Sequence, residues 1–113
     1  MYLNANRNIL IRYEDDAQHQ MTHVFIDHKW IIEKECYCIK AFGSIEESKG
    51  RDLSRAFIIS TFLNDRGQTI NEKRVGVKYD KWDCFECKHQ GYFSFEIMDH
   101  PEIVECILRI EWI

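Results

Sequence analysis

Apolar and polar positions alternate along most of the chain with the two-residue period of extended strands. The pattern is strongest over residues 53–70, where residues 56–63 are β-branched and aromatic with apolar side chains on both faces. Such a strand lies centrally in a sheet or is covered on both sides. Residues 64–68 (Asn-Asp-Arg-Gly-Gln) are typical of a turn, in which Gly67 can adopt positive φ. We therefore predict a central strand that leads into a hairpin.

Further short strands are predicted at residues 8–13, 21–27, 30–42, 69–79, 92–98 and 103–113. In the long segment 30–42, the polar residues 33–35 interrupt the apolar pattern and predict a bend or bulge. The last segment ends the chain with Trp112 and Ile113, which indicates a strand edge available for self-association. Short strands separated by turn signals, without a helical period, predict an all-β fold: a single antiparallel immunoglobulin-like β-sandwich of about seven strands, spanning residues 1–113 as one domain.

Composition narrows the classes of partner. The 113 residues are 45% hydrophobic and 13% aromatic, as in a globular β-rich domain. Lys and Arg number 15 against 19 Asp and Glu, a net charge of −4 that is interspersed along the chain. Because phosphate binding is built from clustered Lys and Arg, nucleic acid is not an expected partner. The nearest basic cluster, around Lys73 and Arg74, is predicted to be a solvated strand face.

The expected location is the cytoplasm. The first apolar run, residues 9–11, is shorter than the ~7 residues that the core of a signal peptide needs, and no run approaches the ~18 apolar residues of a membrane span. The five cysteines are an odd number, which favours reduced thiols over a disulfide framework. These features predict a soluble protein without a membrane partner.

Part of this pattern resembles a known family. Residues 43–45 contain a glycine and precede a charged turn, residues 57–68 form the strand and hairpin, and residues 91–95 read Gly-Tyr-Phe-Ser-Phe. Over about residues 39–113 this order resembles the bacterial immunoglobulin-like domains of the FxLYD type, although Asn64 stands where those domains have a tyrosine. The resemblance implies a sandwich fold with binding or accessory roles, and it implies no catalytic residues.

The cysteines are the best candidates for chemistry. Cys36 and Cys38 share one face of a predicted strand, while Cys84 and Cys87 form a C-x-x-C turn. Together the four could hold zinc in a tetrahedral all-thiolate site, with His89 able to replace one ligand. The alternative is that these cysteines are ordinary thiols that pack as small apolar side chains.

A loop predicted at residues 81–91 carries Trp82 and Phe85, which either plug the end of the sandwich or anchor a protein partner. A thiol nucleophile would need a Cys–His contact beside an oxyanion pocket. We therefore predict a non-catalytic protein-interaction or accessory module without a cofactor, whose partner is another protein or a second copy bound through an edge strand. The alternatives are a zinc-stabilised binding domain and, more remotely, a thiol-dependent enzyme.

Overall fold

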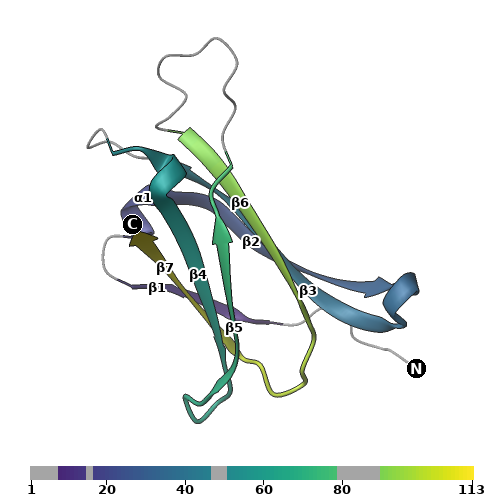
Figure 1. The fold of residues 1–113 in the computed structure, drawn as a ribbon. Coiled ribbons are helices and arrows are strands. Elements are labelled where there is room, and N and C mark those ends of the chain that lie inside the picture. Colours follow the sequence, from purple (N-terminus) through teal and green to yellow (C-terminus); the bar gives the residue numbers. More distant parts are fainter. Residues whose placement is uncertain (1–7, 15–16, 47–50, 79–89) are drawn as a thin grey trace.

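The computed structural model describes residues 8–14, 17–46, 51–78 and 90–113. Strands dominate these residues and form two sheets that face each other as a sandwich (Figure 1), so the predicted all-β fold is confirmed. The larger sheet has the order β1-β7-β4-β5, with bounds Leu10–Tyr13, Glu105–Trp112, Ala56–Leu63 and Thr69–Gly76. The smaller sheet has the order β2-β3-β6, with bounds Met21–Ile31, Cys36–Glu46 and Gln90–Met98. Short helical turns lie at α1 (Ala17–Gln20), η1 (Ile32–Lys34) and η2 (Leu53–Arg55).

Strand β4 is the central strand that its sequence predicts. It pairs with β5 on one side and with β7 on the other, both in antiparallel register. Six of its eight residues are buried, since one face points into the sandwich and Ile59 and Leu63 on the other face are also buried, at 3% and 8% exposure. The buried Ser60 hydroxyl donates to the carbonyl oxygen of Lys73 on β5 at 3.3 Å. Gly67 adopts φ +75° in the following turn, as the hairpin requires.

The hydrophobic core fills the space between the sheets. Phe62 of β4 and Phe95 of β6 meet across the two layers, with ring centroids 5.9 Å apart in an edge-to-face arrangement. The ring of Phe95 also stacks with that of Phe93 on the same strand, at 6.4 Å. Alternate residues of β3 and β7 complete the core, among them Ile39 and Leu108. The two-residue period seen in the sequence therefore places these side chains.

Residues 30–42 do not form one bent strand, and that prediction is wrong. The polar residues 33–35 belong to a hairpin turn: β2 ends at Ile31, η1 follows, and β3 begins at Cys36. Glu35 closes the turn in the left-handed region, at φ 50°, and its backbone N–H donates to the carbonyl oxygen of Ile32 at 3.2 Å. Three polar residues are compatible with either a bulge or a tight exposed turn. In this protein they form the turn, and the chain reverses direction.

The first half of the last strand lies inside the sheet, because the described part of β1 pairs with residues 105–108. The second half, which carries Trp112, has no strand partner on that side among the described residues, so the predicted edge for self-association stays a prediction there. Strand β7 lies between β4 and β1, and β1 joins it as a parallel strand. The N–H groups of Leu10 and Glu14 donate to the carbonyl oxygens of Val104 and Leu108, both at 3.0 Å. Constant-type immunoglobulin domains instead place the first strand beside the second. The alternation of apolar and polar residues indicates which face of a strand is buried, but it does not indicate which strands pair with each other.

One corner of the sandwich is closed by a bridge between the sheets. Lys78, just after β5, and Tyr92 of β6 exchange two backbone hydrogen bonds of 2.9 and 2.8 Å. Gly91 lies beside this bridge, where a Cβ atom would come within 2.7 Å of the Lys78 carbonyl oxygen and of a Val77 methyl group. The close approach of the two backbones therefore requires glycine.

Substituting Gly91 tests this closure. We expect Gly91→Ala to lower the free energy of unfolding by about 1–3 kcal/mol, the range for overpacking, because the obstructing Lys78 carbonyl belongs to the backbone. Gly67→Asn is the control, since nothing lies within 4 Å of a Cβ at that turn glycine and asparagine tolerates positive φ. Urea denaturation measures both, and equal stability of the two variants would contradict the prediction.

Candidate functional site

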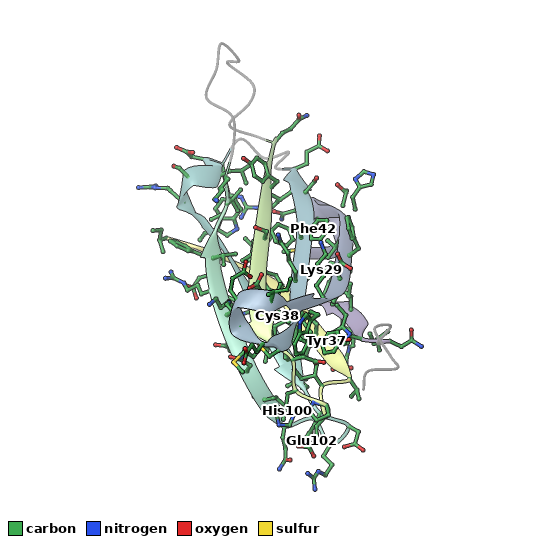
Figure 2. All side chains as sticks on the ribbon, turned by 90° about the vertical axis from the view of Figure 1, so that its right-hand side faces the viewer. Lys29, Tyr37, Cys38, Phe42, His100 and Glu102 are labelled. Atoms are coloured by element: carbon green, nitrogen blue, oxygen red, sulfur yellow. The ribbon has the colours of Figure 1, made fainter. Side chains whose placement is uncertain are left out.

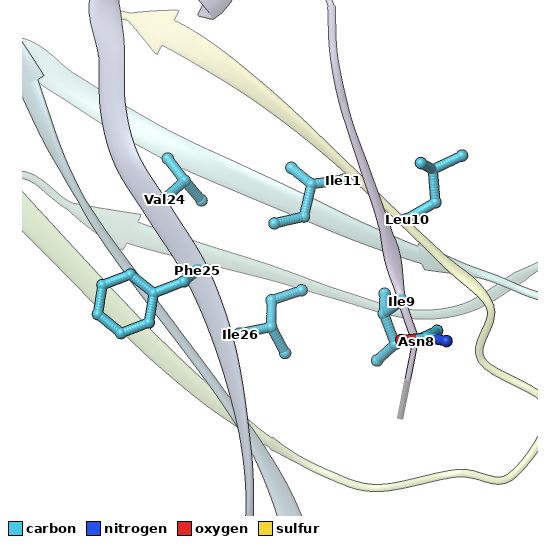
Figure 3. A pocket seen from close by; sticks show the side chains of 7 residues that line it. All are labelled: Asn8, Ile9, Leu10, Ile11, Val24, Phe25 and Ile26. Atoms are coloured by element: carbon cyan, nitrogen blue, oxygen red, sulfur yellow. The ribbon is translucent and has the colours of Figure 1, made fainter. Parts of the chain in front are cut away.

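The opposite corner of the sandwich is open and forms an apolar groove of about 430 Å³ between β1 and β2 (Figure 3). Ile9 and Ile11 point from the first strand towards β2, while Ile26 points back towards them. The side chains of Leu10 and Phe25, which are 60% and 50% exposed, point away from the groove on the far sides of the two strands (Figure 3). An apolar depression between strands that also carry large exposed apolar side chains is typical of a binding surface.

Both walls of the groove are edge strands. Strand β1 pairs only with β7, and β2 pairs only with β3, among the residues that the structure describes. Each therefore has one side without a strand partner in that part of the chain. An unpaired strand side presents a row of backbone N–H and C=O groups, which can template the addition of another strand.

A bulge shapes the β2 wall. The pairing register between β2 and β3 shifts by one residue between Thr22 and Phe25, and His23 adopts the left-handed conformation at φ 54°. The bulge places Val24 against Gly43 of β3, where a Cβ atom would lie 2.8 Å from a Val24 methyl group. Bulges at sheet edges re-aim side chains and end pairing. Here the bulge and the missing side chain at residue 43 bring Val24 into the groove lining.

A polar cluster lies near the far end of β2, away from the groove. His28 Nε2 lies 2.6 Å from Asp99 Oδ2, and the side chains are only 8% and 14% exposed. The imidazole stacks on Tyr37 with ring centroids 4.7 Å apart, and Trp30 contacts the same tyrosine edge-on at 5.2 Å. These contacts fasten the β2–β3 hairpin to the turn after β6. The sequence did not predict this cluster.

Cys36 and Cys38 lie together on β3, as predicted. Cys38 is buried and Cys36 is half-buried. Burial raises the pKa of the Cys38 thiol above its usual range, and a hydrogen bond with Cys36 raises it further. Figure 2 looks at the hairpin from its tip and labels Tyr37 and Cys38, consecutive residues of β3 whose side chains leave opposite faces of the strand.

Cys106 is a separate thiol in the core. It is fully buried, and the loss of hydration raises its pKa to about 12. Such a thiol stays protonated and packs as an apolar side chain.

The other predicted site residues, Trp82, Cys84, Phe85 and Cys87, lie in residues 79–89, outside the described part of the chain. His89 lies there as well. Within residues 8–14, 17–46, 51–78 and 90–113, no group of three or more His, Cys, Asp or Glu side chains is arranged to hold a metal ion. The four-cysteine zinc site and the aromatic anchors therefore stay predictions.

Sequence reasoning missed the groove, although it identified both of its walls as strands. The inward-facing residues of both walls follow ordinary alternation, so the sequence carries no separate signal for the groove. The runs of three consecutive apolar residues, 9–11 and 24–26, instead reflect Leu10 and Phe25, which are exposed on the faces away from the groove (Figure 3).

Comparisons of the chain with protein-family models, with curated proteins and with solved structures found no match. None of the helices in the described residues is both long enough and apolar enough to span a membrane.

Proposed function

We propose that this protein is a non-catalytic binding module that takes up an extended segment of a partner protein in the β1–β2 groove. The observation that carries the proposal is the position of an apolar groove between two edge strands. In strand addition, main-chain hydrogen bonds to an open edge supply affinity, and pockets for alternate side chains supply specificity. This groove offers both kinds of contact.

The lining determines the chemistry of the segment. Ile9, Ile11 and Ile26 face the groove, so a bound strand would place an apolar side chain among them at every second position. Charges near the walls are engaged with each other: Arg12 pairs with Glu105 at 3.1 Å and Lys29 with Asp27 at 3.4 Å. Recognition therefore rests on apolar alternation.

A single strand suits the groove better than a second copy of the whole sandwich. Facing sheets in a sandwich are about 10 Å apart, which leaves room for one strand at their open corner. A folded copy would bring its own second sheet and could meet only the outer sides of the two strands, where Leu10 and Phe25 are exposed (Figure 3). We therefore assign the groove to a flexible segment of a different protein.

Selection of peptides from a random displayed library tests the proposal. We expect enrichment of sequences with apolar residues at alternate positions, which the Ile26→Ser variant binds at least about tenfold more weakly (1.4 kcal/mol). Ile32→Ser is the matched control, because Ile32 is 77% exposed in the η1 turn, away from the groove. Thermal melting of both variants verifies that they remain folded.

Backbone methylation separates strand addition from simple apolar adsorption. N-methylation of either alternate set of peptide residues should weaken binding, because the N–H groups of a strand point alternately to opposite sides and the bound strand has an open edge on each side. Binding insensitive to both sets, or a dimer that Ile26→Ser dissociates, would refute the assignment.

A cytoplasmic location belongs to the same proposal. The described cysteines Cys36, Cys38 and Cys106 are free thiols, and free thiols persist in reducing compartments.

A further inference from the structure

We propose that Cys36, Cys38 and Met98 form a binding site for a soft monovalent cation, Cu(I), on the outer face of the β2-β3-β6 sheet. This face is the opposite one to that which packs on the core: Ile39 and Ala41 of β3 belong to the core cluster, whereas Cys38 does not. Two thiols and one thioether therefore share the outer face of the sheet, where Cys38 is buried at 1% exposure and Met98 is exposed, and the site is independent of the β1–β2 groove.

The pairing register brings the three sulfur-bearing side chains together. Cys36 and Cys38 are two residues apart on one strand and so share a face. Met98 of β6 is the direct cross-strand partner of Cys38, and side chains in such pairs have Cβ atoms about 4.5–5.5 Å apart. Met98 is 65% exposed, so its thioether can cover the two thiols from the solvent side.

The spacing of the thiols suits a shared metal better than a disulfide. Two residues apart on a strand, the Cβ atoms on one face are about 6.6 Å apart. The two Cβ atoms of a disulfide are only about 3.8 Å apart. Two sulfurs on one metal, each at about 2.3 Å, can stand about 4 Å apart. The contact of Cys36 with Cys38 contributes to the raised pKa of the Cys38 thiol, so the two side chains face each other on the same side of the strand.

Ligand softness selects the ion. Thiolate and thioether sulfurs prefer Cu(I), whereas structural zinc takes four nitrogen or thiolate ligands. Binding of one Cu(I) by two thiols releases two protons and leaves a complex with one negative charge, so no oxidant or reductant is consumed. Lys34 and Glu96, paired at 3.0 Å, both lie in the electrostatic field of Cys38, and the carboxylate counters the influence of the ammonium group there.

Anaerobic titration with Cu(I) against a coloured Cu(I) chelator tests the site. The starting protein is the full chain carrying Cys84→Ser and Cys87→Ser, so that the C-x-x-C thiols do not compete. We expect one Cu(I) per chain, loss of binding in Cys36→Ser and at least about tenfold weaker binding in Met98→Leu, a swap that preserves side-chain volume. Cys106→Ala is the thiol control, because Cys106 is buried in the core and its removal should leave binding unchanged.

Three results would overturn the proposal. One is Cu(I) binding that disappears with Cys84→Ser and Cys87→Ser while Cys36→Ser has no effect. Another is Cu(I) binding that Met98→Leu leaves untouched, which would remove the thioether from the site. The third is zinc bound as tightly as Cu(I) by the unsubstituted chain and lost from either cysteine pair, which indicates a four-thiolate centre. Melting curves of each variant confirm that losses of binding occur in folded protein.

Discussion

Replacing Phe62 by alanine should lower the free energy of unfolding by about 3–5 kcal/mol, the range for removing a buried phenylalanine. Phe62 is fully buried on the central strand, and its ring meets Phe95 across the two layers. The two sheets are held at the separation that the side chains between them set, so they cannot close around the cavity. Because small domains have about 5–15 kcal/mol of stability in total, this single change should remove a large part of it.

Urea denaturation followed by tryptophan fluorescence measures the effect. The midpoint should fall while the slope stays constant, because the surface exposed on unfolding hardly changes. Phe25→Ala is the matched control: the same atoms are removed from a residue that is half exposed on the outer side of β2. A loss for Phe62→Ala no larger than that for Phe25→Ala would contradict the packing described between the sheets.

Replacing Asn64 by leucine should cost about 2–3 kcal/mol, since each hydrogen bond contributes on the order of 1 kcal/mol and a stranded donor costs more. Asn64 is 4% exposed at the end of β4. Its Oδ1 accepts from the backbone N–H groups of Arg66 and Gln68 at 3.0 and 2.9 Å, and its Nδ2 donates to Gln68 Oε1 at 2.9 Å. The side chain thus holds together the turn that joins β4 to β5.

Asn64→Asp separates hydrogen bonding from burial. The carboxylate keeps an acceptor for both backbone N–H groups, and rotation of the Gln68 amide can present a donor to it. We therefore expect the aspartate variant to lose clearly less stability than the leucine variant, measured by thermal melting near neutral pH. Equal losses would show that the buried position, rather than the hydrogen bonds, determines the choice of asparagine.

Much of the architecture follows from local pattern. Side chains of a strand alternate between its two faces, so the two-sided apolar run of β4 predicts a central strand that is covered on both faces. Ile58 and Phe62 are fully buried, as expected. The turn at Gly67 follows from residues that tolerate positive φ. The shared face of Cys36 and Cys38 follows from the two-residue period alone.

Only the tertiary structure decides which strands become neighbours. The alternation of β7 is the same whether it lies at an edge or, as observed, between β1 and β4, because side-chain period carries no record of the backbone partner. The polar residues 33–35 fit a bulge and a hairpin turn equally well, and the choice depends on Ile31 pairing with Cys36. The groove and the contact of Met98 with Cys38 arise from segments far apart in the chain.

The sequence by itself therefore determined the fold class, the central strand and the thiol pair, each of which depends on neighbouring residues. Tertiary structure decided the open corner between β1 and β2, the His28–Asp99 contact and the cross-strand position of Met98. These features depend on long-range register, which is fixed when many strand pairs form and bury their apolar faces together. The residues that carry our two proposals lie in strands that the local sequence pattern predicts. Their proximity to each other depends on long-range strand pairing.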